Sequence, residues 1–170
     1  GVGKTTIAGH VFNDNAMERF SPKVWVSVSD NFNLVRVTKA ILESVTSARC
    51  DLEEFSQIQE SLGKALASKK FLVVLDDVWN TCDYDLWAKL QSAFRGGALG
   101  SKVIVTTRDT QVAKMMRSIE VHSLGCMSDD DCWEVFGQHA FLNVENGRLQ
   151  SFELFREKVV AKCGGLPLAL

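Results

Sequence analysis

The 170-residue chain lacks the features of a membrane protein, a secreted disulfide framework or a metal site. No apolar run approaches the roughly 18 residues of a membrane span, and no signal peptide opens the sequence. The five cysteines are scattered and form no C-x-x-C pair, and the three histidines fall in no metal-ligand spacing. We therefore expect reduced thiols in a cytoplasmic, reducing compartment.

The sequence also lacks an excess of charge of one sign. Its formal net charge is −2, and its 46% hydrophobic and 24% charged residues are an ordinary mixture for a globular protein. No overall basic field therefore favours nucleic acid or an anionic membrane as a partner. Internal repeats and low-complexity stretches are missing too, and the length suits one domain, or one with a small appendage.

The first residues are the second half of a phosphate-binding loop, Gly1-Val2-Gly3-Lys4-Thr5-Thr6. A complete loop reads G-x-x-x-x-G-K-[ST], so Gly3, Lys4 and Thr5 take its last three positions. Backbone N–H groups of such a loop cradle phosphates, the lysine reaches the β- and γ-phosphates, and the hydroxyl binds Mg²⁺. The alternative is a glycine turn before a helix, with Lys4 in solvent.

Helical and extended patterns alternate over the first part of the chain. Apolar spacing predicts helices over residues 5–12, 34–45, 55–66, 84–94 and 111–116. Extended runs predict strands over residues 23–28, 71–75, 102–106 and 120–124, and the run 71–75 is typical of a parallel strand buried on both faces.

From Ser128 onward the pattern is helical only. Ser128 is a plausible N-cap, the following aspartates suit a helix N-terminus, and Gly164-Gly165 ends a second helix whose apolar face holds Phe152, Phe155, Val159 and Cys163. We predict an α/β domain over residues 1–127 and a partial helical subdomain over residues 128–170.

Two acids follow the apolar run 71–75. Asp76 and Asp77 stand at the carboxyl end of a central parallel strand, where α/β sheets bind ligands. An aspartate at this place in P-loop proteins helps to hold Mg²⁺, so Asp76 is the metal candidate and Asp77 a residue that orients or activates a water. The alternative is an Asx turn, because aspartate is common after strands.

Arg108 follows the predicted strand 102–106. If that strand adjoins 71–75, Arg108 points at the same end of the sheet as Asp76, where it would touch a γ-phosphate or take the place of its charge partner when that phosphate is absent. The alternative is a solvated surface arginine, which is the usual role of an arginine after a strand.

Together these motifs resemble the NB-ARC domain of plant disease-resistance proteins, a member of the STAND class of P-loop NTPases. Besides the GVGKTT loop, the resemblance rests on VWVSVS at 24–29, FLVVLDDVW at 71–79, GSKVIVTTR at 100–108, DCWEVF at 131–136 and GLPLA at 165–169. It covers nearly the whole chain. Trp79 after the double aspartate is typical of the coiled-coil branch rather than the Toll-receptor-like branch.

The resemblance implies a fold and a set of residue roles. The fold is a three-layer α/β P-loop NTPase with a parallel sheet of order 2-3-4-1-5, followed by the start of an all-α subdomain. Thr5 and Asp76 would hold Mg²⁺, Asp77 would be the catalytic acid, and Arg108 would distinguish ATP from ADP. Pro167 would pack on the adenine, and the phosphates would bind the loop residues Gly1, Val2, Gly3, Lys4, Thr5 and Thr6.

The resemblance also implies a function. The parent protein would be an ATP/ADP switch of intracellular plant immunity, closed with ADP, opened by exchange for ATP and reset by slow hydrolysis. Its coiled-coil and leucine-rich-repeat domains would be partners within one chain, with self-association on activation. Two alternatives stay open: a P-loop ATPase or kinase with productive turnover, and a fragment that binds no nucleotide.

Both ends of the sequence depart from the family pattern. The strand before the loop would precede Gly1, and further helical residues would follow the GLPLA motif. We expect these to be the edges of a fragment, itself inactive and, without an inner strand of its sheet, poorly stable.

Overall fold

The computed structural model describes residues 1–28, 32–79, 83–140 and 155–169. The chain forms two compact units, one of them Thr5–Val121 and the other made of Gly1–Lys4 together with His122–Leu170. Ser29 of the motif at 24–29, Cys82 of the five cysteines and Phe152 of the second predicted helix lie outside the described residues. The division at residue 127 stays a prediction.

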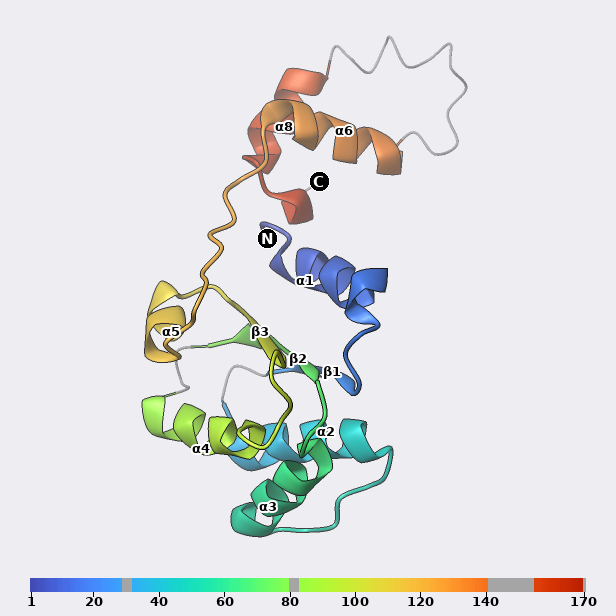
Figure 1. Ribbon diagram of the computed structural model, residues 1–170. Coiled ribbons are helices and arrows are strands. Elements are labelled where there is room, and N and C mark those ends of the chain that lie inside the picture. Colours follow the sequence, from blue (N-terminus) through green and yellow to red (C-terminus); the bar gives the residue numbers. More distant parts are fainter. Residues whose placement is uncertain (29–31, 80–82, 141–154, 170) are drawn as a thin grey trace. The chain divides into compact units, whose positions relative to one another are not determined.

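Helices and strands alternate through the first 121 residues (Figure 1). The strands are β1 (Lys23–Ser27), β2 (Leu72–Val78) and β3 (Lys102–Thr107). The helices are α1 (Lys4–Asn13), α2 (Leu34–Thr46), α3 (Phe55–Leu66), α4 (Tyr84–Phe94) and α5 (Thr110–Met115), with a short 3-10 helix η1 (Asn15–Met17).

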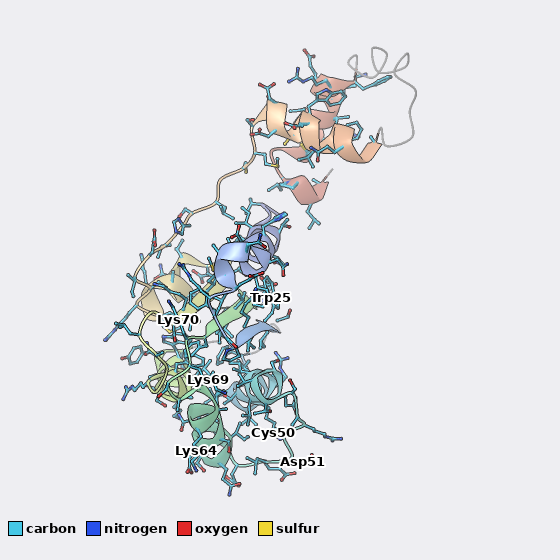
Figure 2. All side chains as sticks on the ribbon, turned by 45° about the vertical axis from the view of Figure 1, so that its right-hand side comes forward. Trp25, Cys50, Asp51, Lys64, Lys69 and Lys70 are labelled. Atoms are coloured by element: carbon cyan, nitrogen blue, oxygen red, sulfur yellow. The ribbon has the colours of Figure 1, made fainter. Side chains whose placement is uncertain are left out.

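The strands form one parallel sheet of order β1-β2-β3, so β2 lies in the middle. Helices α2, α3 and α4 gather on one face of the sheet and α1 lies on the opposite face (Figure 1). Trp25 of β1, labelled in Figure 2, meets the ring of Phe12 from α1 edge to face, with 5.6 Å between ring centroids. The predicted three-layer α/β fold is confirmed, and β1-β2-β3 follows the 2-3-4 part of the expected order.

The core lies between β2 and the helices of one face. Residues 71–75 are at most 2% exposed, as expected of a strand covered on both faces. Val37 and Ile41 of α2 and Ile58, Leu62 and Leu66 of α3 are fully buried. Each such side chain stabilises the fold by about 1.5–3 kcal/mol relative to exposure, which explains why the apolar spacing located both helices.

Side-chain caps set where several helices begin. The oxygens of Asn33, Asp83 and Asp109 accept the N–H groups of Arg36, Leu86 and Gln111 at 2.8–2.9 Å. Each bond satisfies an amide of the first turn that has no partner within the helix. The starts of α2, α4 and α5 thus follow from short polar residues in the sequence.

Two strand predictions need correction. Residues 120–124 form no strand, and residues 121–124 are exposed. A strand forms only where it pairs with a neighbour, and none of β1, β2 and β3 pairs with this run. Strand β2 does not end before Asp76 but continues to Val78, because β1 and β3 both pair with it beyond Leu75.

The smaller unit holds α6 (Asp129–Ala140), α8 (Arg156–Cys163) and the 3-10 helix η3 (Pro167–Ala169). The hydroxyl of Ser128 accepts the N–H of Asp131 and donates to its carboxylate, which confirms the predicted N-cap. Gly164 ends α8 at φ 56°, a left-handed conformation that glycine adopts without strain. Phe155, predicted on the apolar face, is instead 53% exposed, since it precedes the helix.

Cys132, Val160 and Cys163 form the small core between α6 and α8. Burial raises the pKa of the Cys132 thiol, and the neighbouring Cys163 thiol adds to the shift, so Cys132 stays protonated and weakly nucleophilic. The described cysteines, Cys50, Cys126, Cys132 and Cys163, are free thiols.

Candidate functional site

A β-bulge lies at the carboxyl end of β2. Leu75 pairs with Val105 and Val78 pairs with Thr107, so Asp76 and Asp77 on β2 face the single residue Thr106 on β3. Asp77 has φ 58°, which is uncommon for a residue with a side chain. A bulge turns side chains away from their regular alternation and is frequent beside active sites. Both aspartates therefore reach the edge where parallel sheets bind ligands.

Asp76 is a buried acid, 6% exposed, held by two hydroxyls. Its Oδ1 accepts hydrogen bonds from Thr5 Oγ1 at 3.0 Å and from Thr106 Oγ1 at 2.6 Å. Its backbone carbonyl accepts the N–H of Val28 from the β1 side at 2.8 Å. Within the part of the chain that the structure describes, no hydrogen bond reaches Oδ2. The carboxylate is thus fixed in place with one oxygen left for a ligand.

Asp77 and Arg108 form an ion pair beside Asp76. Arg108 Nε lies 3.4 Å from Asp77 Oδ1, and the guanidinium stands over the indole of Trp79 at 5.0 Å. The arginine side chain is 65% exposed and the aspartate 36%, so solvent screens the pair and its net strength is small. A phosphate oxygen can therefore compete with Asp77 for Arg108 at little cost.

The glycine-rich segment leads into α1. Gly3 has φ 87°, and Lys4 begins the helix directly after it. Because glycine has no side chain, residue 3 cannot cap the first amides of α1, and these remain available to an anion. Thr5, the next residue, is the donor to Asp76.

The GLPLA segment contacts Gly1 within the smaller unit. The N–H of Leu168 lies 3.4 Å from the carbonyl oxygen of Gly1, and a Cβ on Gly1 would come within 3.0 Å of Leu168 Cβ. Gly165 adopts φ 75°, and a Cβ there would come within 2.5 Å of Cys126 Cβ. Pro167, at the start of η3, is half-buried beside this contact.

The structure brings together Thr5, Asp76, Asp77 and Arg108, and it places Gly1 near Pro167. The roles assigned to these residues, and to Val2, Gly3, Lys4 and Thr6, stay predictions. Sequence reasoning missed Thr106, the residue that hydrogen-bonds both aspartates. A threonine two residues before the arginine, at the end of the neighbouring strand, was the available signal.

The donor set fits a magnesium ion. A carboxylate and a hydroxyl are hard oxygen ligands, and Mg²⁺ in nucleotide sites uses one or two carboxylates together with phosphates and waters. No preformed cluster of three or more His, Cys, Asp or Glu side chains occurs among the described residues, so phosphates and waters would complete the coordination.

In the ranges that the structure covers, no helix is both long and apolar enough to cross a membrane.

Comparison with known proteins gives one consistent result. Residues 1–146 match the NB-ARC domain family. The chain is 40% identical to the putative disease resistance protein RGA1 of Solanum bulbocastanum over 99% of its length. It is also 40% identical to the putative disease resistance RPP13-like protein 1 and 33% identical to the disease resistance protein RPM1, both of Arabidopsis thaliana, over its full length. The chain spans 16–19% of the length of these three relatives.

Proposed function

The chain belongs to the NB-ARC domain family, and from this premise we propose that it is the ADP/ATP-binding switch module of a plant immune receptor. The observation that carries the proposal is the pair of hydrogen bonds that the hydroxyls of Thr5 and Thr106 donate to the Asp76 carboxylate. It joins the residue after the loop lysine to a buried acid at the end of the central strand. This is the place where a nucleotide's phosphates and a divalent cation would meet.

Lys4, the loop amides and Mg²⁺ would bind the phosphate groups. Lys4 would act as a point charge, and charge-assisted contacts to phosphate are the strong ones. Thr5 and Asp76 would hold Mg²⁺, which supplies positive charge against the phosphate oxygens when it is bound. Pro167 would lie against the adenine, where a rigid apolar ring suits the flat face of a base.

Arg108 and Asp77 would make the site sensitive to the γ-phosphate. In ATP the terminal phosphate offers oxygens to the planar fork of Arg108, which now pairs with Asp77. Release from Arg108 leaves the Asp77 carboxylate able to orient a water for attack on the γ-phosphorus, giving ADP and inorganic phosphate. Since the two nucleotides differ in this contact, they stabilise different states, as a switch requires.

The surrounding protein supplies the rest of the proposed receptor. The relatives named above are disease resistance proteins and are much longer than this chain. We infer that coiled-coil and leucine-rich-repeat domains flank the module, that self-association accompanies activation, and that the protein works inside the cell. Slow ATP hydrolysis would return the receptor to the ADP-bound state.

Calorimetric titration of the natural-length protein with ADP in Mg²⁺ tests nucleotide binding. Lys4→Ala should weaken binding by about 30- to 1000-fold, or roughly 2–4 kcal/mol. Lys70→Ala is the matched control, because it removes a lysine that precedes β2, at the end of the strand away from Asp76 and Asp77. Equal ADP affinity of Lys4→Ala and the parent would refute the assignment. Rapid multiple turnover with little retained ADP would favour an ordinary ATPase over a switch.

A further inference from the structure

We propose that Thr106 is a positioning residue that sets the geometry of both aspartates through a single hydroxyl. The proposal rests on the proposed nucleotide function and adds to it a role for Thr106, which lies in the motif at 100–108 but was given no role of its own. Thr106 would not touch the nucleotide. It would determine where the two carboxylates stand when Mg²⁺ and phosphate arrive.

The bulge makes Thr106 the only β3 residue opposite Asp76 and Asp77. Its Oγ1 donates to Asp76 Oδ1 at 2.6 Å and accepts the backbone N–H of Asp77 at 2.8 Å. A threonine hydroxyl has one proton, so donation to Asp76 leaves only its lone pairs for Asp77. The two bonds therefore have fixed directions and act together.

The first bond fixes the acid proposed to hold the metal. Thr5 and Thr106 both donate to the same oxygen of Asp76, which turns the other oxygen toward a ligand. Thr106 is 7% exposed and Asp76 is 6% exposed. Water is a poor substitute for a hydroxyl lost at so buried a position, and the carboxylate would then turn away from its productive orientation.

The second bond supports the unusual backbone of Asp77. A residue with a side chain is disfavoured at φ 58°, the value for Asp77. The bulge also takes the Asp77 N–H out of the regular hydrogen-bond pattern between β2 and β3. Thr106 supplies the acceptor that this N–H would otherwise lack. The Asp77 carboxylate is thereby held within reach of Arg108.

Removing the Thr106 hydroxyl should weaken ADP binding in the presence of Mg²⁺ and leave ADP binding without Mg²⁺ almost unchanged. Thr106→Val keeps the branched shape and deletes both hydrogen bonds. In the natural-length protein we expect it to weaken ADP binding in Mg²⁺ by about tenfold or more, and to change ADP binding in EDTA by less than about twofold. Thr106→Ser keeps the hydroxyl and should retain binding close to that of the parent in both buffers.

Thr38→Val is the matched control. Thr38 is fully buried in the same unit, and its hydroxyl donates to Leu34 O at 2.6 Å within α2. It should leave ADP affinity unchanged in both buffers. If Thr106→Val does not fold, Thr106→Cys, with a weaker donor of similar size, carries the test with the same expected split.

Three results would count against the proposal. Parent-like affinity of Thr106→Val in Mg²⁺ would overturn it, and so would equal losses with and without Mg²⁺, which mark a general structural role. A parent protein that binds neither ADP nor ATP would refute the proposed function itself and this inference with it. The first two results leave the proposed function standing, so the two failures are distinguishable.

Discussion

The two ends of β2 are built differently. At the amino end, Leu72 pairs with Lys23 on one side and Lys102 on the other, one residue to one. Lys69 and Lys70, labelled in Figure 2, precede the strand, and Lys70 Nζ stands 5.4 Å from the centroid of the Phe20 ring. At the carboxyl end two residues face one, an acid is buried, and Asp77 adopts a left-handed backbone.

The difference shows where this fold retains unfavourable structure. A buried carboxylate and a non-glycine residue at positive φ both cost free energy. Ser47, Ser68 and Arg117 also adopt positive φ, but outside the strands, whereas Asp77 does so within β2, and the paired residues at the amino end of β2 include neither feature. Such features persist where the surrounding structure enforces them, and they cluster at functional sites. Here Thr5, Thr106 and the strand β1 enforce them.

The largest expected effect at the carboxyl end is that of Asp76→Asn. The amide oxygen can still accept from Thr5 and Thr106, so the fold should survive while the charge is lost. A neutral amide is a poor ligand for a hard cation, and we expect Mg²⁺-dependent ADP affinity, measured by calorimetry, to fall about tenfold or more.

Asp77→Asn should bind ADP almost as well as the parent and should instead hydrolyse ATP more slowly. Identical behaviour of the two variants in both assays would contradict this division of roles.

A smaller effect is expected from Arg108→Ala. Because the Arg108 side chain is largely exposed and its ion pair with Asp77 is screened by solvent, its removal should change stability little. It should alter the ratio of ATP to ADP affinity more than it alters ADP affinity alone, as measured by competition between the two nucleotides. Lys114→Ala, on α5, is the control for the loss of a nearby positive charge. Equal losses for ATP and ADP would identify a structural arginine.

The smallest effect is expected at the amino end. Lys70→Ala removes the contact with the Phe20 ring and should lower the free energy of unfolding by about 0.5–1 kcal/mol, measured by urea denaturation. ADP affinity should not change, since Lys70 lies at the amino end of β2 and the aspartates lie at its carboxyl end. If Lys70→Ala lost as much ADP affinity as Lys4→Ala, the proposed difference between the two ends of β2 would be wrong.

Local chemistry made much of the fold predictable. The apolar spacing of α2 and α3, the continuous run 71–75 and the cap at Ser128 depend on residues close together in the sequence, and each was confirmed. The carboxyl-edge placement of Asp76 and Arg108 also followed from the order of the motifs. Family resemblance supplied the strand order, which periodicity alone does not determine.

The remaining features depend on contacts between distant residues. The bulge needs Thr106, 30 residues from Asp76, and an aspartate pair after an apolar run resembles the end of a strand rather than its continuation. The run 120–124 has the composition of a strand, but a strand forms only beside a partner. Phe155 has helical spacing, yet α8 begins one residue later and leaves it exposed.

Anomalous diffraction from crystals of the natural-length protein grown with ADP and Mn²⁺ tests the central claim most directly. Manganese takes the place of magnesium and marks the cation by its anomalous peak. We predict one peak within about 2.5 Å of the Thr5 hydroxyl, with Asp76 bound to it directly or through water, and the ADP phosphates beside Lys4. ADP bound with its cation away from Thr5 and Asp76, or at the lysine-rich end of the sheet, would contradict the account.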